Sequence, residues 1–129
     1  MMSKIGFYKE NFIDEAAAAA SVAATRAVKV GGALGHVYAV AVAGEGGFAI
    51  AAGKKVTLTA TEDDDFNGSF ADSGLSSSRT FAEATDIPEG EVIAELGFTS
   101  YSKNFAKVTF ATDDSAVSGK IKVIPYVRG

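Results

Sequence analysis

Apolar and polar residues alternate along much of the chain with the two-residue period of a β-strand. In residues 55–61, Val56, Leu58 and Ala60 share one face, while lysine and threonine side chains occupy the positions between them. Residues 120–123 repeat the pattern, with lysine and apolar side chains in turn. Because successive side chains of a strand point to opposite faces, one face of each run belongs to a core and the other to water.

The same alternation, with short apolar runs, predicts eight strands between residue 26 and the end of the chain. They cover residues 26–30, 36–42, 48–51, 55–61, 79–84, 91–96, 105–112 and 120–127. Pro125 lies inside the last run, and because proline cannot donate to a ladder we expect that strand to be an edge strand or bulged there. About eight short strands in residues 25–129 predict an all-β protein, a two-layer sandwich or a barrel.

Turn-forming residues stand between the predicted strands, and most of them are glycine. They lie at residues 31–32, 44–47, 53, 67–68, 88–90 and 118–119. Glycine supplies the dihedrals that tight turns require. Residues 44–47 lack the lysine and the serine or threonine of a phosphate-binding loop, so we interpret them as a hairpin turn.

Residues 1–24 differ from the rest and contain an alanine run at 16–20. Propensity favours a helix there, with Asp14 as its N-cap, but Ser21 and Val22 weaken it and a lone short helix is marginal in water. An extended arm lying against another surface is the alternative. We expect an N-terminal arm over residues 1–24 and a β-sandwich domain over residues 25–129.

Charge narrows the classes of partner. The net charge is −4, and division after Asp64 leaves 6 basic and 7 acidic residues in the first half and 6 and 9 in the second. Neither half has the basic excess that binds a nucleic-acid backbone. No apolar stretch approaches the roughly 20 residues of a membrane span, and the first residues do not resemble a secretory signal. We expect no nucleic acid or membrane partner and a protein made in the cytosol.

An acidic run at residues 62–68 is the strongest candidate for ion binding. Asp63, Asp65 and Asn67 alternate as in the first half of a calcium loop, and Gly68 permits its turn. The position that requires a bidentate glutamate is Gly74, so this is a weak calcium candidate. A solvated turn bent at residues 67–68 is the favoured interpretation, and we expect no cofactor.

Catalytic groups are sparse. His36 is the single histidine and starts an apolar strand, which favours a hydrogen-bonded structural imidazole. Residues 76–78 are three serines without the frame of a nucleophile elbow, and we interpret them as a flexible loop. Neighbouring carboxylates on a strand point in different directions and do not make a catalytic pair. We expect a protein that is not an enzyme and has no small-molecule substrate. The chain has no cysteine, which removes thiol nucleophiles as well.

Several stretches, in order along the chain, resemble the small jelly-roll cement, or decoration, proteins of tailed-bacteriophage capsids. They are residues 11–17 as the N-terminal arm, 26–31 and 37–42 as the first strands, 56–66 as a strand ending in an acidic turn and an aromatic residue, and 105–110 and 120–123 as the closing strands. The resemblance implies a jelly-roll-like antiparallel β-sandwich with an extended arm. It also implies a homotrimer on the virion exterior, assembled in the host cytoplasm, that bridges neighbouring subunits of the major capsid protein.

Under this hypothesis the arm and the exposed loops supply the contact with the shell. The candidate partner-binding residues in the arm are Phe7, Tyr8, Phe12 and Ile13. Such a structural protein needs contact area rather than an active site.

Of two other hypotheses, a ligand-binding module stays open and an enzyme is almost excluded. A carbohydrate- or ligand-binding β-sandwich module would use an exposed aromatic such as Tyr101 or Tyr126. A calcium-assisted form of this hypothesis places the ion at residues 63–67. An enzyme on a jelly-roll scaffold would need several histidines around a metal, and this chain has one.

Overall fold

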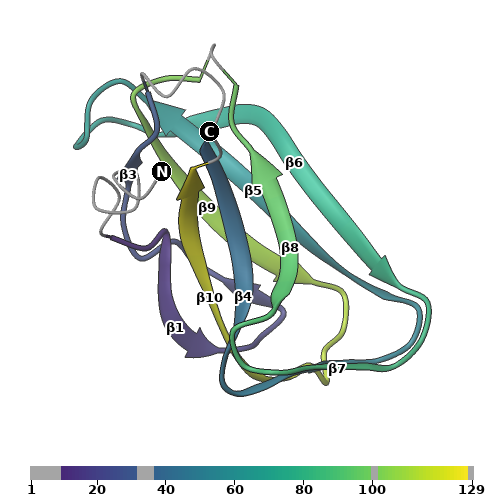
Figure 1. The fold of residues 1–129 in the computed structure, drawn as a ribbon. Coiled ribbons are helices and arrows are strands. Elements are labelled where there is room, and N and C mark those ends of the chain that lie inside the picture. The colour runs from purple at the N-terminus through teal and green to yellow at the C-terminus, as the bar shows by residue number, and fades with distance from the viewer. Residues whose placement is uncertain (1–9, 32–36, 100–101, 128–129) are drawn as a thin grey trace.

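The computed structural model describes residues 10–31, 37–99 and 102–127, which form two packed antiparallel sheets (Figure 1). The strands are β1 (Ile13–Ala17), β2 (Ser21–Val22), β3 (Val28–Lys29), β4 (Val37–Ile50), β5 (Lys54–Asp63), β6 (Ala71–Phe81), β7 (Thr85–Ile87), β8 (Val92–Gly97), β9 (Phe105–Thr112) and β10 (Ser118–Val127). None of these residues forms a helix that could span a membrane.

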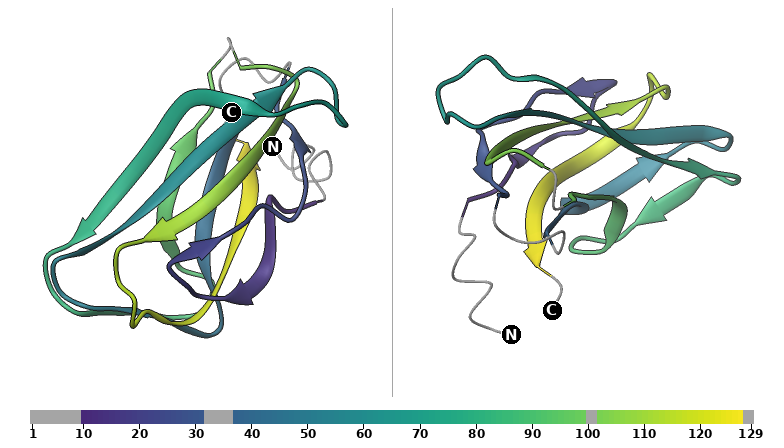
Figure 2. Two further views of the ribbon diagram at one scale, coloured as in Figure 1. Left: turned by 180° about the vertical axis from the view of Figure 1, so that it is seen from behind. Right: turned by 90° about the horizontal axis from the view of Figure 1, so that it is seen from above.

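The first sheet has the order β1-β10-β4, and β8 and β7 pair with successive stretches of the far side of β4. In the second sheet β2 and β3 pair with one side of β9, followed by β5 and β6. Figure 2 shows the two sheets from above as two layers. The all-β sandwich prediction is confirmed.

The pairing is nested, as in one long hairpin that has been rolled up. The first strand pairs with the last, β2 and β3 with β9, β4 with β8, and β5 with β6. This winding is that of a jelly roll. Eight strand positions hold ten strands because β2 and β3 share one position and β7 and β8 share another.

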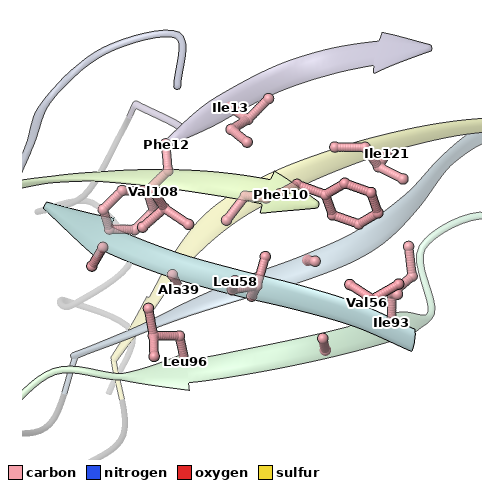
Figure 3. Packing of buried hydrophobic residues seen from close by; sticks show 14 of the residues in the cluster. Phe12, Ile13, Ala39, Val56, Leu58, Ile93, Leu96, Val108, Phe110 and Ile121 are labelled. Carbon is pink, nitrogen blue, oxygen red and sulfur yellow. The ribbon is translucent and has the colours of Figure 1, made fainter. Parts of the chain in front are cut away.

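The core lies between the sheets and follows the alternation in the sequence (Figure 3). On β5, Val56, Leu58 and Ala60 are fully buried, whereas the residues between them are partly exposed. Phe110 on β9 makes an edge-to-face contact with Phe48 on β4, at 6.1 Å between ring centroids. Burying each large side chain stabilises the fold by roughly 1.5–3 kcal/mol relative to leaving it in water.

The alanine run is extended, which answers the choice between helix and arm. β1 pairs with β10, where Ile13 lies opposite Val123, and β2 pairs with β9, where Ser21 lies opposite Ala111. The segment therefore supplies one strand to each sheet. Backbone pairing with the edges of β10 and β9 outweighs the helix propensity of alanine.

The predicted hairpin turn at residues 44–47 is wrong. These residues lie inside β4, which joins two predicted strands into one of 14 residues. Gly46 and Gly47 have φ of 86° and 88°, and the register with β10 shifts between Gly119 and Ile121. Because β10 pairs with one side of β4 on both flanks of the shift, the glycines are absorbed as a bulge rather than a reversal.

The predicted flexible loop at residues 76–78 is also wrong. These serines lie in β6 and pair with β5, and the hydroxyl oxygens of Ser78 and Thr57 are 2.9 Å apart. Cross-strand pairing overrides the low strand propensity of the segment. The predicted strand at 79–84 ends early, because β6 stops at Phe81.

Two turn predictions and the prediction for Pro125 are confirmed. The acidic run links β5 to β6, and residues 88–90 form a turn in which the Glu91 N–H donates to the Pro88 carbonyl at 3.1 Å. Pro125 pairs with Ala39 of β4, while the paired residues of β1 reach only Val123 on the other side of β10. Among the described residues, β10 is thus a local edge at its proline.

Candidate functional site

The acidic turn uses its carboxylates on its own backbone. The Asp65 N–H donates to Asp63 Oδ1 at 2.8 Å, and the Asn67 N–H donates to Asp65 Oδ1 at 3.0 Å. The Gly68 N–H closes the turn on the Asp65 carbonyl at 2.9 Å. These bonds are those of successive Asx turns. Across residues 10–31, 37–99 and 102–127, no three His, Cys, Asp or Glu side chains gather as metal ligands.

The candidate contact residues of the arm fall into two groups. Phe7 and Tyr8 lie outside the described residues, as do His36 and Tyr101. Phe12 and Ile13 are 0% and 1% exposed and belong to the core cluster. The structure therefore gives these two side chains a packing role within the chain.

An ion pair fastens the N-terminal segment. The Arg26 guanidinium donates to Asp14 Oδ1 and Oδ2 at 2.8 and 2.7 Å, and also to the Asn11 carbonyl at 2.9 Å. The hydrogen bond from Arg26 holds the pKa of Asp14 below its usual value. Bidentate geometry fixes the orientation of β1 against the segment that precedes β3.

The most buried carboxylate is that of Asp114, which is 3% exposed. Its Oδ2 accepts the Ala51 N–H at 2.9 Å, and its Oδ1 accepts the Ala116 N–H at 2.8 Å. These backbone hydrogen bonds, the one from Ala51 foremost, lower the pKa of Asp114. Since Ala51 follows β4 and Asp114 follows β9, the carboxylate joins the two sheets, which is a structural role.

A pocket of about 400 Å³ lies at the bulge of β4. Gly47 and Gly119 are among its lining residues, as are the exposed Asp86 and Glu89. The lining holds no histidine, cysteine or lysine. Its one hydroxyl side chain is that of Ser118, and its ionisable side chains are those of Asp86 and Glu89.

The outer face of the second sheet is lined with hydroxyl groups. Thr59 lies opposite Thr109 on β9 and Ser76 on β6, and Thr57 lies opposite Ser78. We call these five residues the hydroxyl face. They are partly or fully exposed, as expected of the solvent side of a half-buried strand.

The outer face of the first sheet is apolar at the corresponding place. Val40, Val42, Val92, Ile124 and Tyr126, which we call the apolar strip, line a shallow groove of about 340 Å³. Val40 and Val42 are each 5% exposed, whereas Val92 and Tyr126 are 43% and 47% exposed. The apolar strip is the candidate binding surface of the described chain.

The sequence interpretation missed this surface, although a signal was present. Residues 37–42 are apolar throughout, whereas β5 alternates strictly. A near-continuous apolar run is the mark of a strand covered on both faces. The sequence pattern predicts only a strand for this run and assigns no partner to its second face.

Comparisons with protein-family models, with curated proteins and with solved structures find no match to this chain.

Proposed function

We propose that this chain is a structural protein that binds the outer surface of a tailed-bacteriophage capsid as a cement protein and bridges neighbouring subunits of the major capsid protein. The observation that carries the proposal is the nested strand order, since the resemblance implies this jelly roll and the paired strands follow it. The homotrimer that the resemblance implies remains a prediction.

The pairing of the N-terminal segment supports a role in resisting tension between capsid subunits. β1 is paired into one sheet and β2 into the other. A pull on the residues that precede β1 therefore acts on the backbone ladders of both sheets and on the clamp between Arg26 and Asp14. Many copies on one shell add their contributions, so modest affinity per copy suffices.

Cosedimentation with capsid shells of the phage that encodes the chain tests the proposal. We expect saturable binding and a rise in the temperature at which the shells come apart. A protein that stays in the supernatant beside intact shells at micromolar concentration contradicts the proposal.

A pair of variants tests the predicted contact residues. The double variant Phe7→Ala/Tyr8→Ala should weaken shell binding by roughly tenfold or more, since buried aromatic anchors are each worth about 1–2 kcal/mol. Binding is compared at a temperature at which both proteins are folded. Ser76→Ala is the control, because Ser76 is exposed within β6, outside the arm and the loops, and its variant should bind like the wild type.

A ligand-binding module is the second candidate, and the exposed Tyr126 in the groove of the apolar strip is the observation that favours it. Binding to a glycan array would support this candidate. The carboxylates of the acidic turn already accept backbone N–H groups, so we expect a chelator to leave the melting temperature unchanged. A melting temperature raised by calcium would favour the module over the cement protein.

A further inference from the structure

The apolar strip lies where a two-layer sandwich normally meets water. The inner faces of the two sheets form the core, and the outer face of an antiparallel sheet is usually polar. β5 obeys this rule, with threonine at its outer positions. β4 does not, because Val40 and Val42 occupy outer positions between the inner Ala39, Ala41 and Ala43. Side chains of the same chain leave these two valines 5% exposed, so the exposed part of the strip is formed mainly by Val92 and Tyr126.

Neighbouring strands extend the strip across the sheet. Residues directly opposite each other in a ladder share a face. Val42 lies opposite Val92 of β8, and Val40 lies opposite Ile124 of β10. Tyr126 continues the row beyond Ile124. The apolar side chains of three strands are therefore one contiguous patch, rather than the scattered apolar residues that any surface carries.

The exposed apolar side chains of the molecule concentrate there. Among the described residues, three large hydrophobic side chains are exposed, namely Phe66, Val92 and Tyr126. Phe66 packs edge-to-face on Phe105, at 5.6 Å between ring centroids. The other two belong to the strip, so a partner that covers the strip removes both from water.

Charge identifies which partner fits. On the same face Glu95 lies opposite Val40, and Lys122 lies opposite Val42. One charge of each sign thus stands on opposite sides of the strip, and these two charges cancel. Such a face meets an identical face without repulsion, and the glutamate of one copy is attracted by the lysine of the other.

One end of the sandwich, unlike the strip, carries a large excess of negative charge. The loops and strand ends around β7, at one end of the sandwich (Figure 1), comprise residues 44–55, 82–91 and 113–119 and carry seven acidic and two basic residues. Their net charge of −5 exceeds the −4 of the whole chain. Two copies that met through this end would repel each other.

We infer that a second copy of this chain covers the apolar strip, so that copies associate through the outer face of β4, β8 and β10. Packing of one outer face on another places the two sheets about 10 Å apart, as in the core of a sandwich. The inference goes beyond the homotrimer that the resemblance implies, because it names the face through which copies associate and does not depend on what the assembly binds.

Solution mass measured by light scattering tests the inference. The wild type should have a multiple of the 13.2 kDa chain mass. Val92→Lys places a charge within the strip and should have the mass of a single chain at the same concentration. The matched control is Ser76→Lys, because Ser76 is also exposed on the outer face of an edge strand, but in the other sheet, and this variant should keep the wild-type mass.

Two results overturn the inference: a wild type with the mass of one chain, or a folded Val92→Lys that keeps the wild-type mass. If Val92→Lys fails to fold, the wild type alone decides. Its melting temperature should rise with protein concentration, because association stabilises the native state by mass action. A concentration-independent melting temperature contradicts the inference.

Shell binding separates this inference from the proposed function. A single-chain wild type that still cosediments with shells overturns the self-association and leaves the cement role standing. An associated wild type that ignores shells does the reverse.

Discussion

The two sheets of this molecule contribute alike to the core and differ on their outer faces. On the second sheet, Thr59 is flanked across the strands by Thr109 and Ser76. On the first sheet, the corresponding centre is Val40, flanked by Ile124 and Glu95. Both are outer faces of antiparallel strands in one sandwich. Because the single chain leaves Val40 only 5% exposed, the contrast in exposed side chains lies at Val92 and Tyr126.

The difference is the one expected if a second copy covers the first face and water covers the second. A hydroxyl group on a half-exposed strand keeps its hydrogen bonds with water or a neighbour, as Thr57 and Ser78 do. A valine at the same kind of position gains nothing from water, and is favoured where something covers it. The composition of an outer face therefore reports on its partner, whereas the composition of an inner face reports on the fold.

Each sheet has a bulge at a glycine. The largest loss in the free energy of unfolding is expected from a substitution at Gly119, the bulge glycine of the first sheet. A Cβ at Gly119 would overlap the Gly47 carbonyl oxygen and lie 2.9 Å from Phe48 Cα, at a φ of 95°. Gly119→Ala should lower the free energy of unfolding by about 2–5 kcal/mol, the sum of left-handed strain and overlap. Urea denaturation measures it.

Gly74, in the second sheet, is the matched control. Its φ is 79°, but nothing lies within 4 Å of an added Cβ. Gly74→Ala should therefore cost only the strain, about 1–2 kcal/mol. Equal losses for the two variants would show that the close approach of β10 to β4 is not what requires Gly119.

A reciprocal exchange tests the two faces directly. Val40→Thr/Val42→Thr converts the first face toward the second and should lower the free energy of unfolding by about 2 kcal/mol, roughly 1 for each hydroxyl placed at a site only 5% exposed. The reverse exchange, Thr59→Val/Thr109→Val, should change it by no more than about 0.5 kcal/mol per site. A costless first exchange would contradict the claim that the strip avoids water.

A smaller loss of stability is expected at Asp114, whose carboxylate links the segment after β4 to the segment after β9. Asp114→Asn leaves one acceptor for two N–H groups, those of Ala51 and Ala116. We expect the melting temperature to fall by several degrees at neutral pH. Asp86→Asn, an exposed carboxylate at the same end of the molecule, should have little effect.

The pH dependence has a definite sign. The pKa of Asp114 is lowered in the folded state, so its contribution to stability is fully present above the ordinary aspartate value of about 3.9. The contribution is lost as the pH falls through the lowered pKa. The gap in melting temperature between wild type and Asp114→Asn should therefore be constant from neutral pH to about pH 5 and close in stronger acid. A gap that widens in acid would contradict this assignment.

Local pattern predicted those parts of the fold that local chemistry determines. Strict alternation placed Val56, Leu58 and Ala60 in the core, and the bounds of β9 agree with the predicted residues 105–112. The acidic turn followed from Asn67 and Gly68, whose backbone preferences act within a few residues.

Other parts depend on strands far away in the sequence. Whether residues 44–47 turn back or bulge is decided by β10, about 75 residues later, which pairs on both sides of the bulge. The alanine run was ambiguous because alanine permits both conformations, and the edges of β9 and β10 selected the extended one. A single sequence shows neither set of partners.

The candidate surface was hidden for a related reason. The continuous apolar run at residues 37–42 indicates two covered faces, but which residues share the outer face follows only from the register that β4 makes with β8 and β10. Tyr126 could be named from the sequence as an aromatic candidate, but Val92 could not.

The most direct test of the contrast between the faces is the reactivity of a single thiol with a water-soluble reagent. The chain has no cysteine, so Val92→Cys and Ser76→Cys each carry one thiol, on the apolar strip and on the hydroxyl face. We predict that the thiol of Val92→Cys reacts slowly in concentrated protein and faster on dilution, while that of Ser76→Cys reacts fast at every concentration. Equally fast reaction of both thiols at high concentration would show that nothing covers the strip and would contradict the account.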